Sequence, residues 1–215
     1  MAGLPVFIHE VHGTGRGPLS KPARNMTYRL LLRARFTIKM LKISVYRQKL
    51  CAVNHEKILN MNYWLMKSEP SVFGIDDLKR RKTEPWEGVR NYQVRNMLRD
   101  DMKPGDLAFF YHSSCAVPGI VGVMEIVSAG YPDPTAFVPE SPYFDANSDP
   151  ARPRWYLVDV RYKRKLKRVI TLEELRLQAP LAQMKLLQKG NRLSIMPLTG
   201  REWDHILGME KTGRS

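Results

Sequence analysis

The residues between positions 86 and 96 combine an aromatic ring, a glycine, amide side chains and guanidinium groups in one short segment. In order they are Trp86, Glu87, Gly88, Val89, Arg90, Asn91, Tyr92, Gln93, Val94, Arg95 and Asn96. An indole offers a face for stacking, and an amide side chain donates and accepts hydrogen bonds, as the edge of a nucleobase does. The segment therefore suits a planar polar ligand, with Trp86 and Asn91 toward a base and Arg90 and Arg95 toward phosphates. The alternative is a surface loop whose tryptophan packs into the core.

Further candidate side chains follow predicted strands or open them. Lys67 and Ser68 end an aromatic and apolar run, and His112 and Ser113 end another. We expect the two serines and His112 to contact a base edge, and Lys67 to contact a phosphate. Trp155 opens a strand after a long loop and is a candidate for a second aromatic wall. Each of these residues could have a structural role in place of a ligand contact, because serine and histidine also occur at strand ends and tryptophan also packs in cores.

Composition indicates a basic protein without a metal or disulfide framework. The formal net charge of +14 is concentrated in residues 1–60, which hold 11 Lys and Arg against 2 Asp and Glu, or +9, leaving +5 for residues 61–215. A modest positive charge favours a polyanionic partner weakly. Cys51 and Cys115 lie far apart and show no metal-ligand spacing. We therefore expect no metal or cofactor, and a reducing compartment: the cytoplasm, or the nucleus in a eukaryote.

Residues 1–60 are expected to form an extension outside the domain. They are rich in arginine and poor in acidic residues, which is compatible with a transit peptide or with a basic arm that contacts nucleic acid. We favour a third interpretation, in which Met61 is the true start and the upstream residues are disordered or mis-assigned. No apolar run is long enough to span a membrane. The domain is then expected at 61–211, with a frayed tail at 212–215.

From position 61 onward, short strands and helices alternate without a regular βαβ pattern. The predicted strands are 62–67, 107–111, 119–127, 155–162 and 193–196. The predicted helices are 71–82, 91–101 capped by Asn91, 171–177 capped by Thr171 with Glu174, 181–187, and a C-terminal helix capped by Thr199. This order predicts an α+β fold, a small and mostly antiparallel barrel or sheet with helices packed outside.

Two segments between these elements have unusual composition. Residues 130–154 are rich in proline and aspartate, which favours a functional flap over a linker. Residues 163–168 form the densest basic run of the domain. We interpret this run as a solvated strand end, ahead of a ridge that contacts phosphates.

The same residues resemble those of a known family, the EVE domain, over positions 61 to about 211. The resemblance is carried by five motifs in order: Trp64, Leu65, Lys67, Ser68, Glu69 and Pro70; Trp86, Gly88 to Tyr92, Arg95 and Asn96; Tyr111 to Ser113; Gly119 to Gly122; and Arg192 to Ile195 with Pro197. It implies a PUA-like fold, a curved β-barrel of about five to six strands flanked by helices. It also implies a non-enzymatic module that takes a flipped-out modified base, notably a modified cytosine of DNA, into a pocket. Met196 stands where valine is more usual, which would alter the pocket shape.

Two other functions are compatible with the resemblance. The related ASCH domains include hydrolases that act on modified nucleosides through a lysine and a glutamate, and Lys67 and Glu69 keep that alternative open. Other PUA domains are RNA-binding accessory modules. A cost of a few kcal/mol for extruding a base has to be offset by contacts in the pocket. Since a methyl group contributes only about 0.8 kcal/mol, we expect modest discrimination between modified and plain bases.

Overall fold

A computed structural model describes residues 61–212, so the predictions for 1–60 and for the last three residues of the chain lie outside the described residues. The strands are β1 (Tyr63–Ser68), β2 (Thr83–Pro85), β3 (Leu107–His112), β4 (Gly119–Ile126), β5 (Tyr131–Pro132), β6 (Tyr156–Leu157), β7 (Asp159–Thr171) and β8 (Ile195–Leu198). The helices are α2 (Ile75–Arg81), α3 (Tyr92–Asn96), α4 (Leu172–Arg176) and α5 (Gly200–Thr212). A π-helical turn follows α3 at Met97–Asp101, and 3-10 turns lie at Pro134–Phe137, Ala179–Leu181 and Lys185–Leu187.

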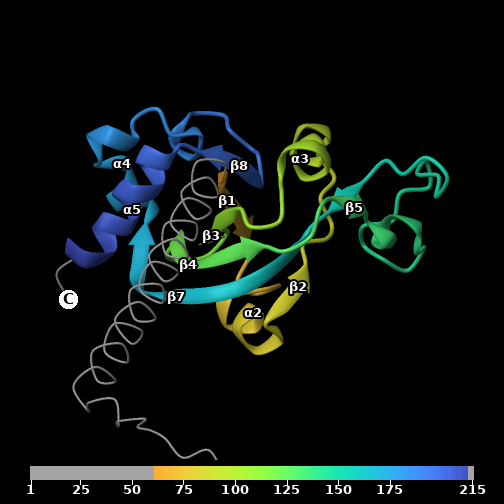
Figure 1. Ribbon diagram of the computed structural model, residues 1–215, viewed down its shortest axis with the longest axis horizontal. Helices are drawn as coiled ribbons and strands as arrows, with labels where there is room; N and C mark the ends of the chain where they lie inside the picture. Colours follow the sequence, from red (N-terminus) through yellow and green to blue (C-terminus); the bar gives the residue numbers. More distant parts are fainter. Residues whose placement is uncertain (1–60, 213–215) are drawn as a thin grey trace, which may run out of the picture. The chain divides into compact units, whose positions relative to one another are not determined.

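Six strands form one curled sheet in the order β2-β7-β4-β3-β1-β8 (Figure 1). The β1–β3 pair is parallel and the other neighbours are antiparallel. The register shifts between β3 and β4 at Phe110/Tyr111, and twice between β4 and β7, which bends the strands. The mixed, curled half-barrel with flanking helices confirms the predicted fold class, and β5 and β6 form a separate two-stranded ribbon.

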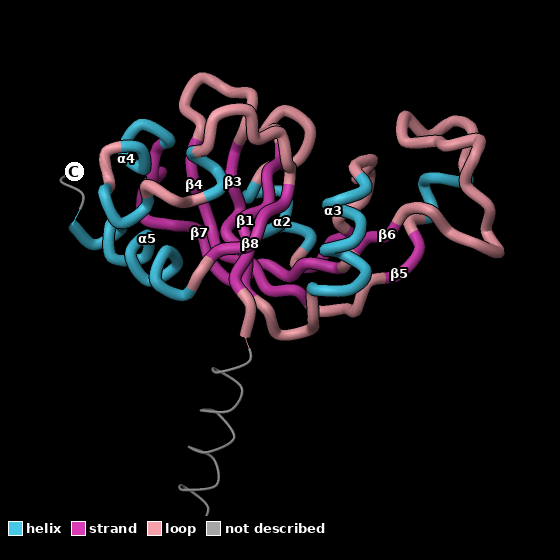
Figure 2. Tube along the Cα trace, turned by 90° about the horizontal axis from the view of Figure 1, so that it is seen from above, coloured by secondary structure: helices cyan, strands magenta, loops and turns pink. Residues whose placement is uncertain are grey.

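Each face of the sheet carries its own core, because side chains alternate along every strand. Trp64 and Phe110 point to the face covered by α2, α3 and the 86–96 segment, whereas Leu65 and Phe109 point to the face covered by α4 and α5. Figure 2 shows α4 and α5 at one end of the sheet and α3 with the β5–β6 ribbon at the other. The buried Trp64 indole donates a hydrogen bond to the buried Asp106 at 3.0 Å, which fixes the start of β1 against the turn before β3.

The predicted caps are confirmed. The Thr171 hydroxyl accepts the Glu174 N–H while the Glu174 carboxylate accepts the Thr171 N–H, and Thr199 with Glu202 makes the same exchange at α5. The Asn91 side-chain oxygen accepts the N–H groups of Gln93 and Val94 at the start of α3. These contacts satisfy backbone donors that a helix leaves open at its N terminus.

Three predicted elements differ clearly from the structure, and one observed strand was not predicted. The helix predicted from position 71 begins at Ile75, because residues 69–73 form a turn in which the Val72 and Phe73 N–H groups both donate to the Glu69 carbonyl. The strand predicted at 155–162 is split into β6 and β7, and β7 continues to Thr171, so the basic run lies within a strand and not beyond its end. The helix predicted at 181–187 is replaced by two 3-10 turns, the first containing a proline at its start. The short β2 was not predicted, since its three residues show no apolar alternation.

The N terminus of α2 is capped from β3. The Ile75 N–H donates to Nε2 of His112 at 3.2 Å, so Nε2 must be unprotonated. Burial lowers the pKa of His112 from its usual 6.5, and the charge of Asp76 opposes this shift only in part, while Lys165 adds to it. The neutral imidazole is therefore part of the folded structure.

We expect the free energy of unfolding to decrease as the pH falls below the usual histidine range. As the pH falls, His112 is protonated in the unfolded chain before it is protonated in the folded protein, because its pKa is lower in the folded protein. The stabilisation is therefore complete above about pH 6.5 and is lost as the pH falls toward the lowered pKa. His112→Asn retains an acceptor that does not titrate. Denaturant unfolding between about pH 7.5 and pH 5 should show a smaller pH dependence for this variant. Equal pH dependence in both proteins would contradict the assignment.

Candidate functional site

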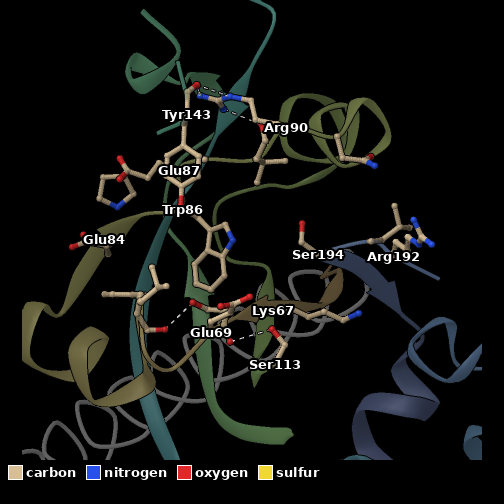
Figure 3. A pocket seen from close by; sticks show the side chains of 18 of the residues that line it. Lys67, Glu69, Glu84, Trp86, Glu87, Arg90, Ser113, Tyr143, Arg192 and Ser194 are labelled. Atoms are coloured by element: carbon tan, nitrogen blue, oxygen red, sulfur yellow. Dashed lines mark hydrogen bonds between the residues drawn. The ribbon is translucent and has the colours of Figure 1, made fainter. Parts of the chain in front are cut away.

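One cavity of about 780 Å³ opens where β1 ends, beside the segment that follows β2 (Figure 3). Five stretches that are remote in sequence form its wall: the end of β1 with the turn after it, the segment from the end of α2 through β2 to the start of α3, Ser113 after β3, one tyrosine of the 130–154 loop, and the residues before β8. The residues that line it are Lys67, Ser68, Glu69, Val72, Phe73, Arg81, Glu84, Pro85, Trp86, Glu87, Gly88, Val89, Arg90, Asn91, Ser113, Tyr143, Arg192, Leu193 and Ser194.

Six of the predicted site residues line this cavity, and four do not. The six are Lys67, Ser68, Trp86, Arg90, Asn91 and Ser113, and the four are Arg95, His112, Trp155 and Met196. The contacts with a ligand that we predicted for all ten remain predictions. The structure does show what each side chain already contacts within the protein, and this limits what it has available for a ligand.

Trp86 forms the inner wall of the cavity. It is 8% exposed and belongs to the core cluster of the same sheet face. Its ring meets Phe110 and Phe73 nearly at right angles, with centroid distances of 5.4 and 6.4 Å. Trp86 therefore satisfies both interpretations of the sequence, since it packs into the core and also borders the cavity.

The small polar side chains of the cavity are partly engaged. The Ser68 hydroxyl donates to the Phe73 carbonyl at 2.7 Å, and the Ser113 N–H donates to the Ser68 carbonyl at 2.9 Å. Asn91 uses its side-chain oxygen to cap α3, which leaves its amide NH₂ group for a ligand. These residues offer a ligand fewer free groups than their side-chain types suggest.

Arg90 is held by a buried carboxylate and by a loop carbonyl. One terminal nitrogen donates to Asp133 at 2.8 Å, the Nε–H donates to the Tyr143 carbonyl at 2.8 Å, and Asp133 also accepts the Gly88 N–H at 3.0 Å. Asp133 is fully buried, and the Arg90 side chain is 22% exposed. Burial alone would raise the pKa of Asp133, but the hydrogen bonds from Arg90, Thr135 and Gly88 outweigh it, so the pKa is lowered. This arginine holds the 130–154 loop against the cavity wall.

Trp155 lies outside the cavity and packs against Arg90. Its indole N–H donates to Asp145 at 2.7 Å, its ring packs on Tyr92 with a centroid distance of 5.0 Å, and the Arg90 guanidinium lies 5.5 Å from its ring centroid. The Arg90 guanidinium also lies 5.7 Å from the ring centroid of Tyr143, so it sits beside two aromatic rings.

The other three predicted residues outside the cavity have structural contacts. Met196 is fully buried in the core of the opposite sheet face. His112 caps α2, as described above. Arg95 donates to the Arg154 carbonyl at 2.7 Å and lies over the ring of Tyr92.

The cavity carries both signs of charge. Lys67 and Arg192 form no ion pair within the described residues, while Arg81 is paired with Glu84. Burial lowers the pKa of Lys67. Burial raises the pKa of Glu87, and the charges of Asp133 and Glu84 raise it further. A ligand therefore meets cationic and acidic groups around one aromatic wall.

The sequence interpretation missed several lining residues. Tyr143 belongs to the proline-rich loop that we predicted to be a flap, and its composition was the only signal. Arg192 and Ser194 belong to a motif that carried the family resemblance, but we assigned no role to them. Glu84 and Glu87 lie on either side of Trp86, and we assigned no contact to either of them, because we considered serine, asparagine and histidine side chains for the base edge and not carboxylates.

The basic run of β7 lies outside the cavity and is largely neutralised. Within the run, Lys163 pairs with Glu125, Arg164 with Glu210, Lys165 with Asp76 and Arg168 with Glu174, and Arg161 just before the run also pairs with Glu125. Exposed pairs of this kind contribute little to stability. They do reduce the positive potential along the strand, which supports the interpretation as a solvated surface over that as a phosphate ridge.

Comparisons with known proteins place these residues in a family. The family model described as the EVE domain matches residues 62–209. Mouse thymocyte nuclear protein 1 is 48% identical over 170 residues, which cover 70% of this chain and 74% of that protein. The human protein of the same name is 45% identical over 169 residues.

Solved structures give the same assignment. Human THYN1 protein in complex with 5-methylcytosine-containing DNA is 45% identical, with a TM-score of 0.67, and the match covers 71% of this chain and 99% of that chain. A protein from Pseudomonas syringae is 49% identical, with a TM-score of 0.67, and the match covers 69% of this chain and 99% of that chain.

We expect Gly88→Ala to displace the 130–154 loop. Gly88 has a φ of +79°, and a Cβ there would lie 2.6 Å from the ring of Tyr143. Gly190 has a φ of +82° with open space around it, so Gly190→Ala carries the same backbone strain of about 1 kcal/mol without the clash. Limited proteolysis should cleave the loop faster in Gly88→Ala than in Gly190→Ala, and urea unfolding should show the larger loss of stability. Equal behaviour of the two variants would contradict the importance of the contact.

We expect Asp133→Ala to lower the free energy of unfolding by about 3 kcal/mol, because it removes one partner of a buried ion pair. The matched control is Asp149→Ala, since Asp149 pairs with Arg152 at 3.9 Å on the surface. Its cost should stay below about 1 kcal/mol. Urea denaturation of both variants measures the difference. Similar decreases in the free energy of unfolding would contradict a larger contribution from the buried Asp133–Arg90 pair.

Proposed function

Because this chain belongs to the EVE domain family, we propose that it binds DNA and takes a modified cytosine, flipped out of the duplex, into the cavity beside Trp86. The observation that carries the proposal is the human relative bound to 5-methylcytosine-containing DNA, which matches this chain over 71% of its length at 45% identity. We propose the ligand of that human protein for this chain because the two share a fold and this chain has an open cavity.

The cavity suits a base in size and in chemistry. Its volume of about 780 Å³ lies within the range of small-molecule sites, roughly 300 to 1,000 Å³. Tyr143 provides aromatic surface, Trp86 forms the inner wall, and hydroxyl, amide and carboxylate groups lie around them. An extruded base needs both kinds of contact, because it loses stacking and pairing when it leaves the duplex.

The cations at the cavity are suited to the backbone next to the flipped nucleotide. Lys67 and Arg192 carry no ion pair within the described part of the chain and both line the cavity. Arg90 contributes by holding the loop and keeps only part of its surface for a ligand. We therefore assign the phosphate contacts to Lys67 and Arg192, with a smaller part for Arg90 and Arg95.

We expect a DNA-binding module to be located in the compartment that contains the DNA. The relatives are named nuclear proteins, and we propose a nuclear location if this chain is eukaryotic, or the cytoplasm if it is bacterial. No helix within 61–212 is long and apolar enough to cross a membrane.

We expect the full chain to bind duplex oligonucleotides that carry 5-methylcytosine about fourfold more tightly than matched cytosine duplexes, because a buried methyl group contributes about 0.8 kcal/mol. The comparison is made by fluorescence anisotropy with cytosine, 5-methylcytosine, 5-hydroxymethylcytosine and N6-methyladenine. Equal binding to all of them would contradict a modified-base pocket. Preference for matched RNA would indicate an RNA-binding module instead.

We expect Arg192→Ala to weaken binding to every oligonucleotide and to reduce the slope of log affinity against log salt by about one, as the loss of one phosphate contact does. The matched control is Arg176→Ala, an exposed arginine on α4 outside the cavity. Salt titrations of wild type and both variants test this assignment. An unchanged slope in Arg192→Ala would remove Arg192 from the interface.

A further inference from the structure

The tryptophans of the described chain differ in what their indole N–H groups contact. The N–H of Trp64 donates to Asp106 at 3.0 Å, and that of Trp155 donates to Asp145 at 2.7 Å. The N–H of Trp86 has no acceptor within hydrogen-bonding distance among the described residues. An indole N–H only donates, and a buried donor without a partner is costly. The contacts of Trp86 therefore leave one strong polar group unused.

This unused N–H is open to the cavity. Within 61–212, the only fully buried side-chain nitrogen or oxygen without a partner is Nε of Arg168, so the Trp86 nitrogen must be accessible. Because Trp86 lines the cavity and is otherwise packed, the small accessible part of its surface faces this space. Figure 3 shows the indole nitrogen on the edge of the ring turned toward the open space, on the side of Ser194.

The accessible area is too small for stacking. A tryptophan side chain has at most about 250 Å² to bury, so an exposure of 8% corresponds to roughly 20 Å². A stacked base covers a whole ring face, which is several times larger. A hydrogen bond, by contrast, needs only the edge of the ring and one donor in the right direction.

We propose that Trp86 recognises the flipped base by donating its indole N–H to an acceptor on the base edge, and not by stacking on it. This inference rests on the proposed function and names one base-edge contact of that site. The acceptor is a ring carbonyl oxygen or an unprotonated ring nitrogen of the Watson–Crick edge, which extrusion leaves free of its pairing partner. Cytosine and its modified forms carry both kinds of acceptor.

This donor also explains how the tryptophan can serve the core and the ligand at once. Its ring is fixed by edge contacts with Phe73 and Phe110, so the N–H points in one direction before the ligand arrives. A pre-oriented donor loses little conformational freedom on binding. The aromatic surface for the base then comes from Tyr143, whose ring lies against Gly88 at the cavity wall.

The test replaces Trp86 in the full chain by β-(3-benzothienyl)alanine, in which sulfur stands in place of the N–H while ring size and shape are kept. The same replacement at Trp203 is the matched control, because Trp203 lies on α5 in the other core and its N–H has no acceptor among the described residues either. Thermal unfolding of both proteins verifies that packing is unchanged. Binding is measured with 5-methylcytosine and cytosine duplexes.

We expect a loss of roughly tenfold or more at position 86, because an acceptor on the bound base is left without its partner, and no change at position 203. If the 86 replacement binds as well as wild type, while Trp86→Leu binds poorly, Trp86 is a stacking surface and the proposal is wrong, although the proposed function stands. If wild type itself shows no preference for a modified base, the proposed function fails and this inference fails with it.

Discussion

The buried carboxylate of Asp133 determines where one wall of the cavity stands. It accepts hydrogen bonds from the Arg90 guanidinium and from the Gly88 N–H, and it also caps the 3-10 turn of its own loop through Thr135. Two segments more than forty residues apart are thereby joined at a point that water does not reach. Since each group in this cluster satisfies another, removal of one leaves a buried polar group without a partner. The position of Tyr143 over the cavity follows from this cluster.

The other polar side chains of the cavity are likewise partly used for contacts within the protein. Ser68 and Asn91 use part of their hydrogen-bonding capacity on the turn and the helix that surround them. What remains for a ligand includes an indole N–H, an amide NH₂, two cations that have no ion pair within residues 61–212, and the carboxylates of Glu69 and Glu87. Such a set can distinguish the edges of planar ligands. It does so with few contacts, which agrees with a site that recognises a small chemical modification.

Local patterns in the sequence predicted most of the fold, and long-range contacts account for what they could not predict. The apolar runs of β1 and β3 and the Thr171–Glu174 cap depend on neighbouring residues, so they were visible in the sequence. The role of Arg90 depends on Asp133, 43 positions away, and Lys165 pairs with Asp76 at a separation of 89. The sequence alone does not show whether a cationic side chain is free to bind a phosphate or is already paired with a carboxylate of the protein. Trp86 and Ser68 line the cavity and Trp155 and Met196 do not, while the base contacts predicted for all four remain predictions.

The parallel pairing of β1 with β3 has a consequence for how this domain can diverge. The connection between these strands carries the turn after β1, α2, β2 and the 86–96 segment, and with them most of the cavity lining. Some residues of this connection, such as Ile75 and Trp86, pack in the core, whereas others, such as Glu69 and Glu87, line the cavity without belonging to either core. Substitutions at exposed lining positions such as Glu69, Val72 and Glu87 therefore change the ligand surface without altering the core or the strand pairing. The fold separates a packed scaffold from exposed recognition positions, which makes those positions the natural place to introduce a new specificity.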